Sequence, residues 1–292
     1  IRDSYRLGDF YEMFFDDAIV VSKELELTLT GKSCGAEERA PMCGVPYHAV
    51  EGYLNKLVAN GHKVAICEQV EDPKLAKGLV KREVIRIVTP GTNTDMQALD
   101  ESKNNYIMCI VYLADKYGIS LADISTGDYF VTEVDTERKL IDEINKFAPS
   151  EIICNESFYM SGVDLSDMKN RLGIAVYSLE AWYFSDETAE NTLKEHFKVQ
   201  SLEGLGLSDY ACGTIAAGAL LRYLYETQKN DLGNLSAIHP YSTGKYMIID
   251  SSTRRNLELV ETLREKQKRG SLLWVLDKTK TAMGARTLSA YV

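Results

Sequence analysis

Residues 106–134 read YIMCIVYLADKYGISLADISTGDYFVTEV, and this stretch decides the fold of the middle of the chain. Residues 106–113, 118–124 and 129–134 are rich in β-branched and aromatic side chains, which favour strands. Turn-forming residues separate them at 115–118 and 125–128. The stretch therefore predicts three antiparallel strands in a meander.

The sequence after the meander alternates between helical and strand patterns. Leu140, Ile141, Ile144 and Phe147 recur at helical spacing and predict an amphipathic helix. Further elements follow as a strand at 152–154, a helix near 165–172, a strand at 175–177 and a helix over 213–228. Three antiparallel strands followed by alternating helices and strands match the order of an RNase H-like α/β domain, by analogy at the level of the fold.

The residues before the meander predict a smaller α/β unit. An extended aromatic run covers 10–15, and Asp16–Asp17 is expected to cap a following helix. Apolar residues at helical spacing predict a second helix over 48–60, ended by Gly61, and short strands follow at 64–67 and 84–88. The sequence TPGT at 89–92 ends this unit.

Two further segments complete the expected organisation. Residues 93–105 are polar and aperiodic, which indicates a linker. Ser252 or Thr253 is expected to cap a helix over 254–268, ended by Gly270. We therefore predict an α/β multi-domain protein with a first domain over 1–92, a linker over 93–105, a second domain over 106–230 and the start of a helical domain over 231–292.

Composition fits a globular protein and excludes several other classes. The chain has 292 residues, of which 45% are hydrophobic and 26% are charged, so neither disorder nor a fibrous repeat is expected. No apolar run approaches the ~20 residues of a membrane-spanning helix. Its first residues include neither a methionine nor an apolar signal region, so we expect a chain that starts inside a longer protein. The six cysteines form no CxxC pair and are expected to be reduced core thiols of a cytosolic protein.

The net charge of −10 is distributed unevenly along the chain. Residues 1–92 carry 12 Lys and Arg against 14 Asp and Glu, residues 93–230 carry 11 against 23, and residues 231–292 carry 10 against 6. Because binding to nucleic-acid phosphates depends on Lys and Arg, the middle segment is the least suited to touch DNA.

Two motifs could indicate enzymatic sites, and each also has a simpler structural interpretation. Gly31–Lys32–Ser33 resembles the end of a phosphate-binding loop, but Glu26 occupies the position where that loop needs its first glycine. Asp115, Asp123 and Asp128 could hold Mg²⁺ in an RNase H-like nuclease or resolvase, and this remains the alternative function. No Glu or His completes that carboxylate set, so solvated loop carboxylates are the favoured interpretation.

A basic cluster covers residues 74–86, where five cations face Glu83 alone and give a net charge of +4. Such a cluster is either a solvated loop or a strip that follows DNA phosphates. Its members are Lys74, Lys77, Lys81, Arg82 and Arg86.

Phe10 and Glu12 lie in the most informative sequence, RLGDFYEMFFDDA at 6–18. Composition alone makes Phe10 a buried strand residue. Together with APMCGVPYHAVEGYLNKLVANGHKVAICEQVEDP at 40–73 and RIVTPGT at 86–92, however, the string resembles the mismatch-binding domain of the bacterial MutS family, which recognises DNA mismatches. TRRNLEL at 253–259 and SLLWVLDKTKTAMGARTL at 271–288 resemble the start of that family's lever domain.

The resemblance implies specific DNA-binding residues. It implies that Phe10 enters the minor groove as a wedge at a mispaired or unpaired base and that Glu12 hydrogen-bonds to that base. Arg39, Met42 and Tyr47 flank family positions near the DNA backbone, and Lys74, Lys77 and Lys81 are further candidate backbone contacts. The polar sequence at 1–5 replaces an apolar strand usual in the family, which predicts a poorly ordered edge of the first domain and weaker DNA binding.

The resemblance also implies what the rest of the chain does. Residues 106–230 would be an RNase H-like connector without nuclease chemistry, so no catalytic residue, cofactor or metal is expected within the chain. The full-length protein would be cytoplasmic and nucleoid-associated, would use ATP and Mg²⁺ in a C-terminal ATPase domain, and would act as a homodimer with the partner MutL. A MutS relative specialised for other DNA structures is less compatible with Phe10 and Glu12 occurring together.

Overall fold

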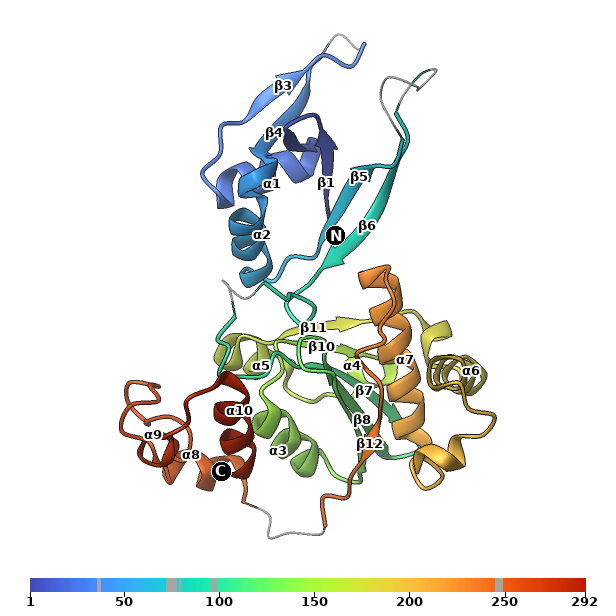
Figure 1. The fold of residues 1–292 in the computed structure, drawn as a ribbon, viewed down its shortest axis with the longest axis vertical. Coiled ribbons are helices and arrows are strands. Elements are labelled where there is room, and N and C mark those ends of the chain that lie inside the picture. Colours follow the sequence, from blue (N-terminus) through green and yellow to red (C-terminus); the bar gives the residue numbers. More distant parts are fainter. Residues whose placement is uncertain (36–37, 72–77, 79, 96–98, 245–248) are drawn as a thin grey trace. The chain divides into compact units, whose positions relative to one another are not determined.

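The computed structural model describes residues 1–35, 38–71, 78, 80–95, 99–244 and 249–292 (Figure 1). Lys74 and Lys77 lie outside the described residues. The chain divides into two compact units, one formed by residues 1–95 with 224–231 and the other by 96–223 with 232–292. Both units combine a β-sheet with helices, which confirms the predicted α/β class.

The first unit contains a six-stranded sheet in the order β3-β4-β2-β1-β5-β6. β1 and β5 run parallel, and the other neighbours are antiparallel. The strands are β1 Arg2–Leu7, β2 Phe10–Phe14, β3 Thr30–Lys32, β4 Ala40–Pro46, β5 Val64–Gln69 and β6 Arg82–Val88. The prediction of a poorly ordered edge at residues 1–5 is wrong, because β1 pairs on both sides with β2 and β5 inside the sheet.

Two helices cover one face of this sheet, α1 Phe15–Glu24 and α2 Val50–Ala59. Alternation along β2 sends Tyr11 and Met13 into the core with them. The predicted cap of α1 is wrong, because the N-cap residue is Phe14 and it makes no side-chain cap bond. Asp17 lies in the first turn instead, where it accepts hydrogen bonds from the Arg2 guanidinium at 2.8 Å and from the Asp3 amide at 3.0 Å.

The second unit has the sheet order β11-β10-β7-β8-β9-β12. The predicted meander is confirmed, since β7, β8 and β9 pair antiparallel, and β10 and β11 add in parallel beside β7. This arrangement is that of an RNase H-like sheet. The strands are β7 Ile107–Leu113, β8 Lys116–Asp123, β9 Asp128–Val134, β10 Glu151–Cys154, β11 Ala175–Ser178 and β12 His239–Pro240.

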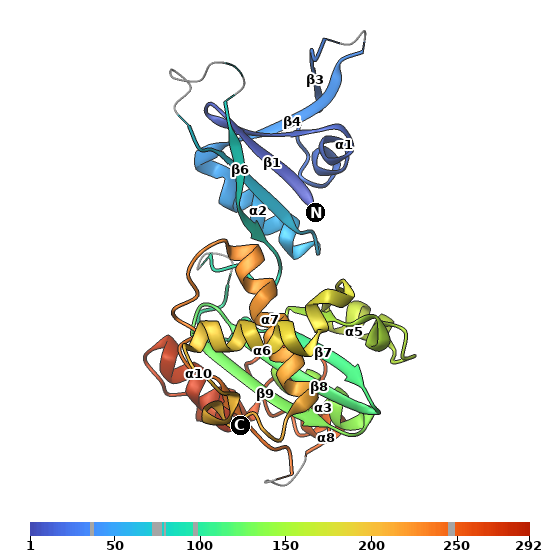
Figure 2. The ribbon, with the colours of Figure 1, turned by 90° about the vertical axis from the view of Figure 1, so that its right-hand side faces the viewer.

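Helices cover both faces of the second sheet, and Figures 1 and 2 show α3 on one side of it and α7 on the other. On one face, Leu140, Phe158 and Met168 of the helices pack with strand residues in a single hydrophobic core. On the opposite face, the Tyr129 hydroxyl donates to the Ala217 carbonyl at 2.6 Å. The helices are α3 Glu137–Phe147, α4 Glu156–Tyr159 and α5 Leu165–Leu172 on the first face, and α6 Asp186–Phe197 and α7 Ala211–Gln228 in the second group.

The last part of the chain corrects one helix prediction. α8 covers only Ser251–Asn256, with Asp250 as its N-cap, and the chain is not helical from 257 to 271. Leu257, expected with Val260, Glu261 and Arg264 along one side of a helix over 254–268, is exposed. Since a helix in a protein gains most of its stability from packing an apolar face, this segment lacks the contacts that would extend α8. α9 Leu272–Leu276 and α10 Ala282–Tyr291 follow.

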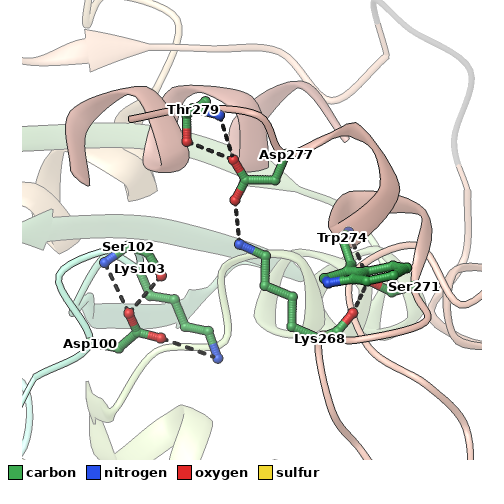
Figure 3. A network of polar contacts seen from close by, with 8 residues as sticks. All are labelled: Asp100, Ser102, Lys103, Lys268, Ser271, Trp274, Asp277 and Thr279. Atoms are coloured by element: carbon green, nitrogen blue, oxygen red, sulfur yellow. Dashed lines mark hydrogen bonds and ion pairs between the residues drawn. The ribbon is translucent and has the colours of Figure 1, made fainter. Parts of the chain in front are cut away.

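Polar contacts order the segment that follows α8 (Figure 3). Lys268 pairs with Asp277 at 2.5 Å, and the Ser271 hydroxyl caps α9 by accepting from the Trp274 amide at 3.2 Å. The Lys268 pair and hydrogen bonds from Thr279 lower the pKa of Asp277 to about 2. Among the described residues, no helix is long and apolar enough to cross a membrane.

Candidate nucleic-acid interface

The sheet of the first unit has one face that the helices leave uncovered, which we call the open face. It carries Phe10, Glu12 and Phe14 of β2, together with their register partners Tyr5, Leu7, Met42, Gly44 and Pro46 on β1 and β4. All of these side chains are partly or fully exposed, whereas Tyr11 and Met13 between them are buried.

Phe10 is the most exposed side chain of β2. It is 47% exposed, although it is a large aromatic residue at the start of an interior strand. The strand begins directly after the Gly8–Asp9 turn, where Gly8 has φ +62°, a conformation that glycine adopts at little cost. Composition alone favoured a buried Phe10, and the structure corrects that interpretation: the alternation of β2 gives the core to Tyr11.

The turn before Phe10 is held from two sides. The Arg6 Nε donates to the Gly8 carbonyl at 2.5 Å, and the Arg6 guanidinium lies 4.1 Å from the centre of the Tyr47 ring. The Tyr47 amide donates to the Asp9 carbonyl at 2.9 Å. These contacts restrict the backbone from which the Phe10 ring projects.

Tyr11 fixes the same strand from the buried side. Its hydroxyl donates to the Glu68 carboxylate on β5, two strands away. Burial, followed by the nearby Glu68, raises the pKa of Tyr11 to about 12, so its hydroxyl stays protonated and remains a donor across the physiological range.

Glu12 lies two residues from Phe10 on the same face of β2. Its Oε2 forms an ion pair with Nζ of Lys32 on β3 at 2.6 Å, and the Lys32 ammonium also lies 5.5 Å from the Phe14 ring centre. Gly44 occupies the register position between these strands, where an added Cβ would lie 3.5 Å from Glu12 Cγ and 3.2 Å from the Tyr11 carbonyl. The glycine therefore avoids a tight contact with the Tyr11 carbonyl, whereas the contact with Glu12 Cγ would be an ordinary one.

The other predicted contact residues fall in different places. Met42 shares the open face with Glu12, and Arg39 is exposed just before β4. Tyr47 is exposed beside the Phe10 turn, while Lys81 is exposed before β6 and pairs with Glu83 at 2.6 Å. The structure thus gathers Phe10, Glu12, Met42 and Tyr47 around β2 and β4, and leaves Lys81 at the far edge of the sheet.

Sequence reasoning missed two members of this site, Arg6 and Lys32. Lys32 was considered only within the GKS motif, and the structure places it in strand β3 and not in a loop that opens a helix. Its proximity to Glu12 depends on the register of β2, β4 and β3, which is a long-range property. No local signal in the sequence could have found this pair.

A hollow of about 480 Å³ adjoins the open face and is acidic. It is lined by Asp3, Tyr5, Leu7, Phe14, Phe15, Asp16, Asp17 and Arg82. Because its carboxylates repel phosphate, this hollow is a poor path for a nucleic-acid backbone.

Asp115, Asp123 and Asp128, the carboxylates considered for a nuclease site, do not all converge, because only Asp123 and Asp128 lie close together. Asp115 and Asp123 flank opposite ends of β8, which at ~3.3 Å per residue separates them by more than 20 Å. Buried Asp123 accepts hydrogen bonds from the Asn105 and Ser125 amides, and the Asn104 side chain bridges it to Asp128. Among the residues described, no three His, Cys, Asp or Glu side chains form a metal-binding group. The nuclease alternative is not favoured.

Comparison with known proteins identifies the family. Sequence models of MutS domains I, II and III match residues 4–97, 105–236 and 252–292 respectively. The chain is 68% identical to the DNA mismatch repair protein MutS of Lachnoclostridium phytofermentans over 99% of its own length and 31% of that relative.

Two further relatives agree with this match. The chain is 51% identical to the DNA mismatch repair protein MutS of Ruminiclostridium cellulolyticum and 52% identical to that of Acetivibrio thermocellus, in each case over 99% of the chain and 33% of the relative. The chain therefore spans about a third of the length of these relatives. With three successive domains of one family matched in order along its length, the chain belongs to the MutS family.

Proposed function

We propose that this chain recognises mismatched DNA by inserting Phe10 as a wedge at a mispaired or unpaired base. The observation that carries the proposal is the exposure of Phe10 on the open face, next to a strand neighbour, Tyr11, that is buried. Family membership supports DNA mismatch repair as the biological setting.

The physical basis of recognition is the softness of a defective base pair. Inserting an aromatic ring into a base step costs a few kcal/mol of stacking in intact duplex. A mismatch has already lost part of that stacking and pairing, so the same insertion costs less there. The Arg6 and Tyr47 contacts support this role, because a wedge transmits force only from a fixed backbone.

Glu12 is expected to lower the affinity for intact duplex. A carboxylate beside DNA phosphates is repelled unless a base offers it a hydrogen-bond donor or it takes up a proton. Glu12 lies on the same face as Phe10 and two residues away, so it follows the ring toward the base. We infer that Glu12 penalises intact duplex and thereby sharpens discrimination.

The remaining parts of the proposal concern the longer protein. We propose that residues in this chain bind and position DNA without catalysing a reaction, and that ATP and Mg²⁺ act in sequence beyond it. Homodimerisation and MutL binding belong to the same proposal. Residues 93–230 carry 11 basic and 23 acidic residues, so this part of the chain is better suited to contacts with proteins than with phosphates.

The test compares Phe10→Ala with wild type in the full-length protein that contains this chain. We expect the preference for a G·T duplex over a matched duplex to fall by about fivefold or more, since removing a stacked aromatic contact costs ~1–3 kcal/mol. Phe15→Ala is the matched control, because Phe15 is also an exposed aromatic residue of the same unit. Retention of the full preference in Phe10→Ala would refute the wedge.

A further inference from the structure

The ion pair between Glu12 and Lys32 joins a proposed base-contacting carboxylate to a cation that sequence analysis left without a role. Oε2 of Glu12 and Nζ of Lys32 are 2.6 Å apart, with 17% of the Glu12 side chain and 45% of the Lys32 side chain exposed. No other hydrogen bond to the Glu12 carboxylate occurs within the described part of the chain. Lys32 is therefore the described side chain that holds the Glu12 carboxylate in position.

Lys32 has two consequences for Glu12 that act in the same direction. It neutralises much of the negative charge that would otherwise repel intact duplex. It also occupies one carboxylate oxygen and so competes with a base donor for Glu12. The first effect raises affinity for matched DNA, and the second lowers affinity for mismatched DNA.

We propose that Lys32 is a specificity-determining residue that acts through Glu12 and moderates the discrimination between mismatched and matched duplex. Without Lys32, Glu12 would reject ordinary DNA more strongly and would be free to meet a donor on a mispaired base. With Lys32 in place, the protein keeps enough affinity for matched duplex to move along it in search of a defect. This inference rests on the proposed function of Glu12.

A simpler role for Lys32 makes a different prediction. If Lys32 only contacts a phosphate, its removal weakens binding to both duplexes equally and reduces the slope of log affinity against log salt by ~1 in each case. That loss would be the same whether or not residue 12 carries a charge. A double-mutant cycle therefore separates the two roles.

The experiment measures binding of G·T and matched duplexes by fluorescence anisotropy for wild type, Lys32→Met, Glu12→Gln and the double variant, all in the full-length protein. We expect Lys32→Met to raise the ratio of mismatched to matched affinity by about 2- to 5-fold, the range set by a partly exposed ion pair. In the Glu12→Gln background, we expect Lys32→Met to leave the ratio unchanged.

Two further variants serve as controls, and a third is a substitute for Lys32→Met. Lys32→Arg keeps the cation and should retain the wild-type ratio. Lys23→Met removes an exposed lysine from the last turn of α1, in the helix layer, and should not change the ratio. Lys32→Gln keeps a polar side chain on the exposed strand and replaces Lys32→Met if the methionine variant does not fold.

The outcomes are distinct. An unchanged or lowered ratio in Lys32→Met, or a rise that persists with Glu12→Gln, overturns the role of Lys32. Phe10→Ala measured in the same series tests the proposed function separately. If wild type shows no mismatch preference, or Phe10→Ala keeps it, the proposed function itself fails. If both of those tests hold and the Lys32 series does not, this inference alone is wrong.

Discussion

Phe10 and Tyr11 are consecutive residues of β2 whose side chains lie on opposite faces of one sheet, 47% and 6% exposed respectively. The buried Tyr11 hydroxyl donates to Glu68, while the Phe10 ring faces solvent. One aromatic residue therefore anchors the strand and its neighbour is available to a partner. This division of roles leads to separable predictions for the two positions.

Tyr11→Phe should lower stability and preserve mismatch preference. The change leaves the ring in the core but removes its hydrogen bond to the Glu68 carboxylate, at a cost of about 1.5–3 kcal/mol for a bond to a charged group. Phe10→Ala should change the free energy of unfolding by less than about 0.5 kcal/mol, as expected for an exposed position. Urea unfolding measures both. Equal destabilisation by the two variants would contradict the assignment of faces.

Asp123→Asn should destabilise the second unit, and we expect no DNA cleavage that depends on Asp123. Asp123 is fully buried and accepts from two backbone amides and from Asn104 and Ser125 side chains. An amide group places NH₂ against at least one of these donors, which leaves a buried donor unsatisfied and costs about 1–3 kcal/mol. Asp115→Asn is the control, because Asp115 is exposed in the β7–β8 turn and Asn tolerates its positive φ.

Thermal unfolding and a DNA cleavage assay of Asp123→Asn and Asp115→Asn separate a structural role of Asp123 from a catalytic one. Cleavage of branched or mismatched DNA with Mg²⁺ that Asp123→Asn abolishes, while the fold persists, would restore the nuclease alternative. A melting temperature lowered only in Asp123→Asn supports a structural carboxylate.

Features set by adjacent residues were predictable from the sequence, whereas features set by contacts between distant residues were not. The strands of the meander were predictable because their side-chain pattern and turns are properties of adjacent residues. The prediction of a helix over 254–268 was wrong because such a helix needs a packing partner for its apolar side, and Leu257 of that side remains exposed. The pairing of Glu12 with Lys32 was not predictable, since it depends on the register of three strands.

The Lys268–Asp277 pair predicts a defined response to acid. The lowered folded-state pKa of Asp277, about 2 against an ordinary 3.8, means that its ionised form is favoured by folding. Its contribution to stability is therefore present above pH 3.8 and is lost as the pH falls through about 2. NMR titration of the Asp277 carboxyl should show this value in wild type and a higher one in Lys268→Met. A titration unchanged by Lys268→Met would show that Thr279 alone holds the carboxylate.

Arg6 supports the backbone at Phe10 without lying on the open face, since its register partner is the buried Tyr11. Its Nε donates a hydrogen bond to the Gly8 carbonyl, and its guanidinium lies over the Tyr47 ring. Arg6→Met removes both contacts and should therefore loosen the turn that precedes Phe10. We expect mismatch affinity to fall about 2- to 5-fold, comparable to the ~0.5–1 kcal/mol of an exposed cation–π contact. Arg6→Lys should not restore it, because a lysine lacks the planar group that stacks and bonds at once. Full recovery with lysine would indicate that Arg6 acts only through its charge, and the anisotropy measurement that defines the Phe10 effect distinguishes these cases.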